Sequence, residues 1–473
     1  MTSPLIIQGG MGIGVSGWRL AGAVGSAGGL GVVSGVALDS QLARRLQDGD
    51  ADGTLRRALS QFPVPEIAKA VLSRYFVPGG RRDDQQYRAL SRLTLTPSRD
   101  RQLLAVVGAF VEVHLAKQAA RGARVGMNLL EKIQLATPAA AYGAMLAGVD
   151  VVLAGAGIPA RLPSLLNALA HHRQVEFPID VAGAGKTHFS LRFDPVELLG
   201  RRLAPLVRPL FLAIVSSHTL AAFLARDEQT RPDGFVVEGP IAGGHNAPPR
   251  GAVQLDERGD PVYGPKDEAN PPQFIALGLP FWLAGGFSRP EQVTAACAAG
   301  ASGVQVGTLF ALSEESAMAP ALRLQLLERL RRGDLVVRTD VRASPTGFPF
   351  KVARLSGTLS EPPVYQHRRR VCDLGYLRTL AMSPEGTVVY RCPAEPVAAY
   401  VQKGGDPGET ADRVCLCNAL IATIGLAQPR RSHAEPAIAT LGADLDGALE
   451  LLREHPEGWA ARDVLSYLTP SST

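Results

Sequence analysis

Short apolar runs alternate with longer segments of helical pattern along most of the chain. Eight of these runs are nearly continuous in apolar residues, as expected for strands buried on both faces of a parallel sheet. They are Leu5–Gln8, Leu30–Ser34, Val125–Leu129, Val149–Ala154, Phe211–Val215, Gly234–Glu238, Phe281–Ala284 and Gly303–Val306. This alternation predicts an α/β protein with a closed (β/α)8 barrel (TIM barrel), in which ligand groups come from the carboxyl ends of the strands.

Three segments do not fit a plain barrel. Residues 40–122 have a mostly helical pattern and are too long for one strand-to-helix connection, which predicts a helical insertion over one face of the barrel. Two alternating runs, Val175–Val181 and His188–Phe193, predict an inserted hairpin at about residues 174–193. After about Arg338 the alternation of strands and helices stops. We therefore expect a barrel over residues 1–338 and a C-terminal appendage over 339–473.

Composition and charge narrow the class of protein. The chain has 473 residues, of which 46% are hydrophobic and 20% charged, which suits a large folded barrel with additions. The net charge is only +5, and the one dense basic run, His367–Arg370, has no interleaved aromatic residues, so we expect no nucleic-acid partner. The most apolar stretch, residues 144–158, is short and contains Asp150, so we expect no membrane span.

The chain has five cysteines, and four of them fall in the expected appendage: Cys372, Cys392, Cys415 and Cys417. An odd number of cysteines and the absence of a secretory pattern at the N-terminus indicate a reducing, cytoplasmic location. The Cys415-Leu-Cys417 spacing is not that of most zinc sites, so we expect packed thiols and no metal. A structural zinc or an iron–sulfur cluster remains the alternative. Cys297 lies in an alanine-rich helical segment, where we expect it to pack inside.

The strongest chemical motif runs from Gly234 to His245. A buried strand ends at Glu238, and a loop of small residues that includes Gly243 and Gly244 leads to His245. Adjacent glycines let backbone N–H groups approach a flat or anionic ligand without a Cβ in the way. A histidine at the mouth of a barrel can exchange protons near neutral pH. The motif therefore predicts His245 as the catalytic residue and the two glycines as cofactor-binding residues.

Two further glycine turns follow the seventh and eighth strands, where barrels commonly bind a phosphate through backbone N–H groups. They predict a phosphate site at Gly285, Gly286, Gly307 and Thr308. The first strand ends in Gln8-Gly-Gly-Met-Gly-Ile-Gly, whose spacing does not fit a dinucleotide fingerprint. We expect this turn to form a ledge beside a flat ring, to which Asn128 at the end of the third strand supplies a side-chain amide.

Together these motifs resemble the nitronate monooxygenase family, formerly 2-nitropropane dioxygenases, and are similar to the related flavin-type enoyl-acyl-carrier-protein reductases. The matching pieces are Pro4–Met11, Met127–Asn128, Glu238–His245, Ala284–Gly286 and Gln305–Phe310. The resemblance implies non-covalent FMN, His245 as the catalytic histidine, and Gly10, Met11 and Gln305 among the cofactor-binding residues. The chain departs from the family at Gly10, where a proline usually precedes the methionine, and in its long insertion and appendage.

The resemblance implies as leading function an FMN-dependent monooxygenase that oxidises alkyl nitronates with O2, His245 holding or deprotonating the substrate. A single phosphate motif without a second nucleotide fingerprint favours FMN over FAD. One alternative is an FMN-dependent enoyl-thioester reductase that uses NAD(P)H. Another is a flavin-binding partner subunit of a biosynthetic assembly, with the appendage as docking module. The physiological substrate stays open, and so does the oligomeric state, for which a homodimer is the candidate.

Overall fold

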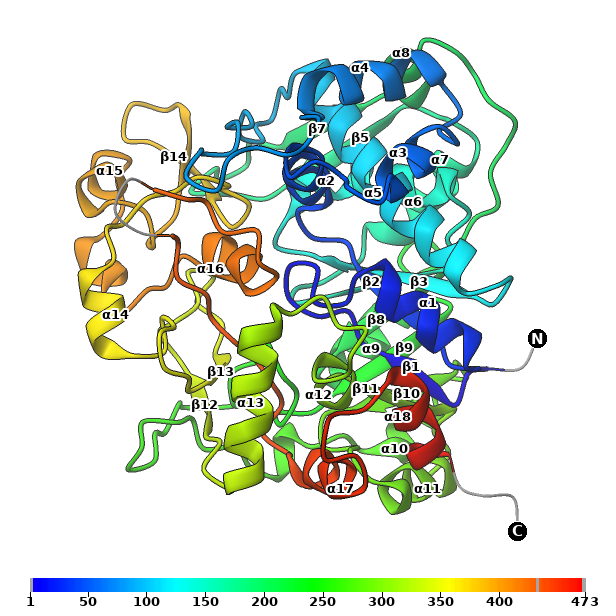
Figure 1. Ribbon diagram of the computed structural model, residues 1–473, viewed down its shortest axis with the longest axis vertical. Coiled ribbons are helices and arrows are strands. Elements are labelled where there is room, and N and C mark those ends of the chain that lie inside the picture. Colours follow the sequence, from blue (N-terminus) through cyan, green and yellow to red (C-terminus); the bar gives the residue numbers. More distant parts are fainter. Residues whose placement is uncertain (1–2, 431–433, 470–473) are drawn as a thin grey trace.

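The computed structural model describes residues 3–430 and 434–469, and its centre is a sheet of eight parallel strands (Figure 1). The strands are β1 (Ile6–Gln8), β2 (Gly31–Ser34), β3 (Val125–Leu130), β4 (Val151–Gly155), β8 (Leu210–Val215), β9 (Gly234–Glu238), β10 (Phe281–Ala284) and β11 (Gly303–Val306). Their order in the sheet is β1-β11-β10-β9-β8-β4-β3-β2. The expected TIM barrel is confirmed, and each of the eight strands lies where its apolar run predicts it.

The barrel closes between its first two strands. Ile7 forms a parallel bridge with Leu30, and the Gln8 N–H donates to the Leu30 carbonyl at 2.9 Å. One step further along, the Gln8 side chain replaces backbone pairing: its Oε1 accepts from the Val32 N–H at 3.0 Å, and its Nε2 donates to the Val32 carbonyl at 3.2 Å. A fully buried glutamine thus satisfies the backbone groups at the seam.

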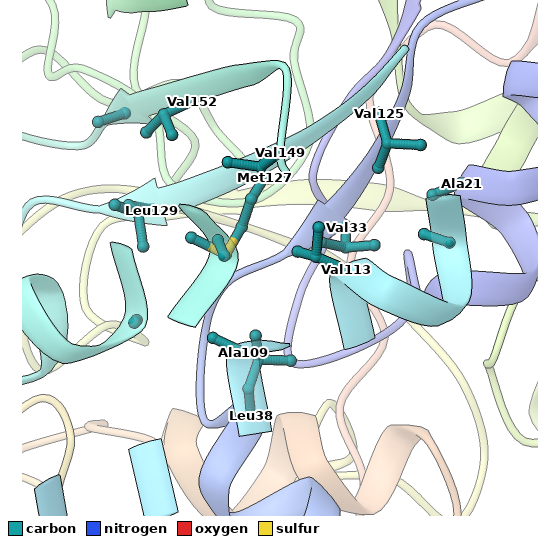
Figure 2. Close-up of a cluster of buried hydrophobic side chains, with 14 of the residues drawn as sticks. Ala21, Val33, Leu38, Ala109, Val113, Val125, Met127, Leu129, Val149 and Val152 are labelled. Carbon is teal, nitrogen blue, oxygen red and sulfur yellow. The ribbon is translucent and has the colours of Figure 1, made fainter. Parts of the chain in front are cut away.

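The strand residues alternate between the barrel interior and the layer of helices outside it. The interior cluster contains Ile7, Val32, Leu153, Ile214, Val236 and Trp282. The intervening residues face outward and join the main core with the helices. Figure 2 shows part of this layer, which includes Val33, Met127 and Val152; Val33 lies beside Val113. Burial on both faces explains why the strands are continuous apolar runs.

Helices cover the outside of the barrel. Those that follow the strands are α1 (Trp18–Ser26), α5 (Arg99–Ala119), α6 (Thr137–Leu146), α7 (Leu162–Ala170), α9 (His218–Ala225), α10 (Pro271–Ile275), α11 (Pro290–Ala298), α12 (Thr308–Ala311) and α13 (Pro320–Arg332). Short 3-10 turns lie at Gln134–Ala136, Pro265–Asp267 and Pro407–Thr410. Cys297 on α11 is exposed, so the expectation that it packs inside is wrong: it lies on the solvent face of that helix.

The connection between β2 and β3 is helical, as its pattern predicts. It contains α2 (Leu38–Gln47), α3 (Thr54–Leu59) and α4 (Pro65–Tyr75) before it reaches α5. Helix α5 packs between α1 and α6, as a barrel helix does, and its residues are buried almost all round. The segment inserted into the barrel between β2 and β3 therefore consists of α2, α3, α4 and the chain between α4 and α5.

The segment around residue 180 joins the barrel to the C-terminal part of the chain. Strands β5 (Val175–Ile179) and β7 (Phe189–Phe193) pair antiparallel and are followed by α8 (Pro195–Leu199). Between them β6 (Val181–Ala182) pairs with β14 (Thr379–Met382), which pairs with β15 (Val388–Arg391).

The chain after residue 338 folds back over the barrel mouth. Its elements are the antiparallel pair β12 (Val337–Asp340) and β13 (Phe350–Ala353), then α14 (Pro362–His367), α15 (Val397–Gln402), α16 (Leu416–Thr423), α17 (Asp446–Glu454) and α18 (Ala461–Leu468). The last two helices return to the barrel beside α1 and α12 (Figure 1). Between them, the Trp459 Nε1–H donates to the Leu309 carbonyl at 2.8 Å. The division into domains at residue 338 stays a prediction.

The expectation that the chain has no membrane-spanning helix can be compared with the structure. Within residues 3–430 and 434–469, no helix combines the length and the apolar character needed to cross a bilayer. The cytoplasmic location and the absence of a nucleic-acid partner remain predictions.

Candidate active site

The candidate site lies at the carboxyl ends of the strands, in two adjoining cavities. We call the first, of about 820 Å³, the glycine-lined cavity. Nine of the expected site residues line it: Gly10, Met11, Gly243, Gly244, Gly285, Gly286, Gln305, Gly307 and Thr308. We call the second, of about 880 Å³, the apolar cavity; it adds Asn128 and His245 and shares Gly10, Gly243 and Gly244 with the first. All eleven residues singled out from the sequence therefore lie around one continuous site.

The glycine-lined cavity is shaped by glycine residues whose backbone lies close to neighbouring segments of the chain. Gly285 and Gly286 both have φ of +84°, which favours glycine, and a Cβ on Gly285 would lie 2.9 Å from the Ala242 nitrogen. Across the cavity, the Gly442 N–H donates to the Thr308 Oγ1 at 2.8 Å. The hydroxyl hydrogen of Thr308 remains a donor for a ligand. Residues 440–442 thus form one wall, which the sequence did not predict.

Two buried amides point to a polar ligand. The Oδ1 of Asn128 and the Oε1 of Gln305 are buried and have no hydrogen-bond partner among the described residues. Each residue lines one of the two cavities, and a buried unpaired carbonyl oxygen is costly unless a ligand donor or water meets it. A Cβ on Gly10 would lie 2.3 Å from the Asn128 Cβ, so the departure from proline at Gly10 leaves space for this amide.

His245 is held by residues from after position 338. Its Nε2 lies 2.7 Å from the Ser344 Oγ, and its ring packs edge-on against Phe350 with centroids 4.9 Å apart. Strand β13 also fixes the backbone on either side, because the Lys351 N–H donates to the Gly244 carbonyl at 2.9 Å. No described residue hydrogen-bonds to the other ring nitrogen, Nδ1. That nitrogen is available to a substrate.

Three ionisable groups at the site have shifted pKa values. Burial of the ring, helped by the positive charge of Lys132, lowers the pKa of His245 to about 4. Burial raises the pKa of Glu238 to about 7, against the opposing effect of Lys351. Burial also lowers the pKa of Lys351 to about 8, although its ammonium donates to the Pro240 carbonyl and the Thr339 hydroxyl. At neutral pH the imidazole is therefore uncharged, and the carboxyl exchanges its proton readily.

The walls of the apolar cavity suit an uncharged ligand. Its side chains include Ile13, Val36, Leu130, Ile133, Ile214, Phe350 and Leu420. Among the described residues that line it there is no lysine or arginine, and its ionisable groups are Glu238, His245, Tyr376 and Cys417. An anion in this cavity would have no basic side chain on the lining to pair with.

A third cavity, of about 1670 Å³, adjoins the apolar cavity at Tyr376 and Leu377, and we call it the outer cavity. Its lining includes three basic residues, Lys132, Arg161 and Arg378, and two carboxyl groups, Glu131 and Asp180, of which Asp180 pairs with Arg161 at 2.6 Å. The Lys132 ammonium lies 4.7 Å from the centroid of the Phe348 ring. The outer cavity therefore combines apolar surface with positive charge, which the apolar cavity lacks.

The four cysteines of the C-terminal part are free thiols, and all except Cys372, which is partly exposed, are buried. In the described part of the chain, no group of three or more histidine, cysteine, aspartate or glutamate side chains is arranged to hold a metal. Cys417 lines the apolar cavity. The expectation of packed thiols stays a prediction for chemical analysis.

Comparison with protein families finds a match over the strands and loops around His245. Residues 209–346 match the family model described as nitronate monooxygenase. The resemblance inferred from the motifs is confirmed. The matched residues run from β8 through β11 and include the Glu238–His245 loop and both glycine turns. This match supports an oxidoreductase.

One curated relative is a (3aS,4S,5R,7aS)-5-hydroxy-7a-methyl-1-oxo-octahydro-1H-indene-4-carboxyl-CoA dehydrogenase of Mycobacterium tuberculosis, 31% identical over 123 residues. The matched part is 26% of this chain and 30% of the relative, so the chain spans less than a third of that protein's length.

Among solved structures, the chain is similar to nitroalkane oxidase from Streptomyces ansochromogenes, with 16% identity, 99% and 95% of the two chains covered and a TM-score of 0.47. FabK from Thermotoga maritima is 16% identical, with 99% of this chain and 92% of that chain covered and a TM-score of 0.44. The enoyl reductase domain of MlnA from the macrolactin biosynthesis cluster of Bacillus amyloliquefaciens is 11% identical. The match covers 99% of this chain and 94% of that chain, with a TM-score of 0.47.

Proposed function

We propose that the protein is an FMN-dependent reductase of an enoyl thioester, with NADH or NADPH as electron donor. The observation that carries this proposal is the uncharged character of the apolar cavity. A nitronate is an anion, and at neutral pH it would meet a neutral His245 and a partly ionised Glu238 there, with no basic side chain on the described lining. A neutral thioester with an apolar acyl chain has no such cost.

The residues present fit a flavin mononucleotide. Gly285, Gly286, Gly307 and Thr308 would hold its single phosphate with backbone N–H groups and a hydroxyl. Asn128 and Gln305 would meet polar edges of its ring with their unpartnered amide oxygens. FMN held by these residues would supply hydride transfer from the reduced nicotinamide to the carbon–carbon double bond of the substrate.

His245 and Glu238 would have different tasks in this reaction. With Nε2 fixed at Ser344, a neutral His245 can turn an Nδ1–H toward the thioester carbonyl and polarise it. The overall reduction also consumes one proton, which must reach the α-carbon of the substrate. Glu238 lines both cavities and is close to half-protonated at neutral pH, so it is the better-placed source of that proton.

The outer cavity supports a long substrate. A thioester carried on a phosphopantetheine arm, whether of coenzyme A or of a carrier protein, has an apolar acyl end and a phosphate some distance away. The apolar cavity would take the acyl end, and Lys132 and Arg378, which form no ion pair with a described carboxylate, lie in the adjoining cavity, where a phosphate would find positive charge. The name of the dehydrogenase relative, a carboxyl-CoA enzyme, agrees with a thioester substrate.

Oxidation of alkyl nitronates with O2 is the second candidate, favoured by the family match over residues 209–346. To separate the candidates, the isolated chain is assayed for NAD(P)H oxidation that depends on crotonyl-pantetheine, and for nitrite release from propyl-2-nitronate. We expect the first activity. Nitrite release without the first would replace the proposal by the nitronate function. A flavin-loaded chain with neither activity would favour the partner-subunit alternative.

A further inference from the structure

A fourth cavity, of about 790 Å³, lies between the helical insertion and the C-terminal part of the chain. It shares no lining residue with the three cavities of the candidate active site. Four arginines line it, Arg44, Arg88, Arg92 and Arg101, against one carboxylate, Asp373. We call it the arginine cavity.

Two of these five charges are neutralised within the protein. Arg101 forms a buried ion pair with Asp39. Asp373 pairs with Arg430 at 2.8 Å, which lies outside the cavity lining. The remaining three arginines have no carboxylate within ion-pair distance among the described residues.

The partners of these three arginines are carbonyl groups and a ring. Arg44, only 6% exposed, donates to the Leu426 carbonyl at 2.5 Å and stacks over Tyr87 with 4.9 Å to the ring centroid. Arg92 donates to the Cys372 carbonyl at 2.5 Å, and Arg88 to the Arg74 carbonyl. Burial lowers the pKa of Arg44, which means that its surroundings disfavour the charge it carries.

Three guanidinium groups around one cavity repel one another, and a buried one without a counter-ion is costly. An anion in the cavity would remove both penalties. Guanidinium groups bind phosphate with paired N–H donors, and three of them match a group with more than one negative charge. We propose that the arginine cavity is a second binding site, separate from the active site, for a phosphate or pyrophosphate group.

The site also touches the wall of the substrate cavities. Ser40 and Arg101 line the arginine cavity, and the Ser40 Oγ lies 2.7 Å from the Tyr376 hydroxyl. That hydroxyl also donates to Asp39, the partner of Arg101. Tyr376 lines both the apolar and the outer cavity. Arg101 donates to the same hydroxyl at 3.3 Å. A phosphate in the arginine cavity would therefore lie beside two of the three residues that bond to Tyr376, between the helical insertion and residues 371–374.

The test is calorimetric titration of the flavin-loaded protein, in phosphate-free buffer, with inorganic phosphate and with pyrophosphate. Arg88 and Arg92 are exposed at residue level, so Arg88→Gln and Arg92→Gln should leave the fold intact. Arg332→Gln is the matched control, an exposed arginine on α13. The flavin content of each variant is measured alongside, so that loss of the active site is recognised.

We expect at least one probe to bind, with affinity about tenfold weaker in each single variant, weaker still in the double variant and unchanged in Arg332→Gln. Binding of both probes indicates that a single phosphate group suffices, whereas binding of pyrophosphate alone indicates a site for a diphosphate. Failure of both probes to bind at millimolar concentration would overturn the proposal, as would binding that the double variant retains. No turnover is measured, so the result stands or falls independently of the proposed reductase function.

Discussion

The Nε2 atom of His245 and the hydroxyl oxygen of Ser344 lie 2.7 Å apart, although 99 residues separate them in the chain. The contact joins the glycine loop of the barrel to the turn before β13. It fixes one ring nitrogen and leaves the other for the substrate. The orientation of the candidate catalytic residue thus depends on a part of the chain outside the barrel strands.

Replacement of His245 by alanine should abolish most turnover and leave the flavin bound. The residues expected to hold the flavin are backbone groups and Gln305 of the glycine-lined cavity and Asn128 of the apolar cavity, none of which needs the imidazole. Loss of a general acid–base or polarising group typically costs about 10²–10⁴-fold. The measurement is kcat with the flavin content of the same preparation. Normal turnover at normal flavin content would remove His245 from the mechanism.

Replacement of Ser344 by alanine should act through His245. The ring loses the partner of Nε2, while Phe350 still packs against it, so we expect a smaller loss in kcat than for the His245 variant. The double variant tests the connection. If Ser344→Ala lowers kcat further in a His245→Ala background by the same factor as in the wild type, the two residues act independently.

The acid sensitivity of the fold should carry a contribution from His245. Its pKa is lowered from 6.5 to about 4 in the folded protein, so the unfolded chain takes up a proton first as the pH falls. The free energy of unfolding therefore has a His245 contribution that is complete above pH 6.5 and is lost between there and about pH 4. Denaturant unfolding across this range should show a shallower loss in His245→Gln, and equal pH dependence in both proteins would contradict the assignment.

Glu238 should be visible in the flavin spectrum. Its pKa is raised to about 7 by burial, and it lines both cavities, so its ionisation changes the charge next to the ring. We expect the visible absorbance of the oxidised protein to shift with a midpoint near neutral pH. Glu238→Gln should abolish this titration while it retains flavin. A titration that persists in the variant belongs to another group.

The local parts of the fold were predictable from the sequence. Each barrel strand is a continuous apolar run because both its faces are buried, and the glycine turns at Gly285 and Gly307 stand at fixed places after those strands. Residues brought together over long separations left no such signal. Ser344, Thr440 and Tyr376 have ordinary local patterns, and only the folding of the C-terminal part over the barrel mouth brings them to the site.

Helix α5 shows why the bounds of the helical insertion could not be predicted from the sequence. The pattern of residues 40–122 correctly indicates helices, but α5 is buried almost all round and lacks a polar face that would mark it as a barrel helix. Its packing between α1 and α6 identifies it. The sequence alone likewise does not distinguish the arginines of the arginine cavity from solvated surface charges. Only the structure shows that Arg44 is buried.

The cysteines should behave as packed thiols. Cys415 and Cys417 are buried, and Cys415→Ser or Cys417→Ser should each lower the free energy of unfolding by about 1–2 kcal/mol with flavin retained. Elemental analysis of the wild type should find metal far below one atom per chain. About one zinc per chain, or iron with matching sulfide, would show that the cysteines bind a metal.

The proposed function requires that the site reduce a neutral enoyl thioester with FMN. The direct measurement is the visible absorbance of the flavin under anaerobic conditions, first with NADH or NADPH and then with crotonyl-pantetheine. We expect a reduced nicotinamide to bleach the flavin and the thioester to restore the oxidised spectrum, while propyl-2-nitronate leaves the oxidised protein unchanged. Bleaching by the nitronate, together with no recovery on addition of the thioester, would contradict it.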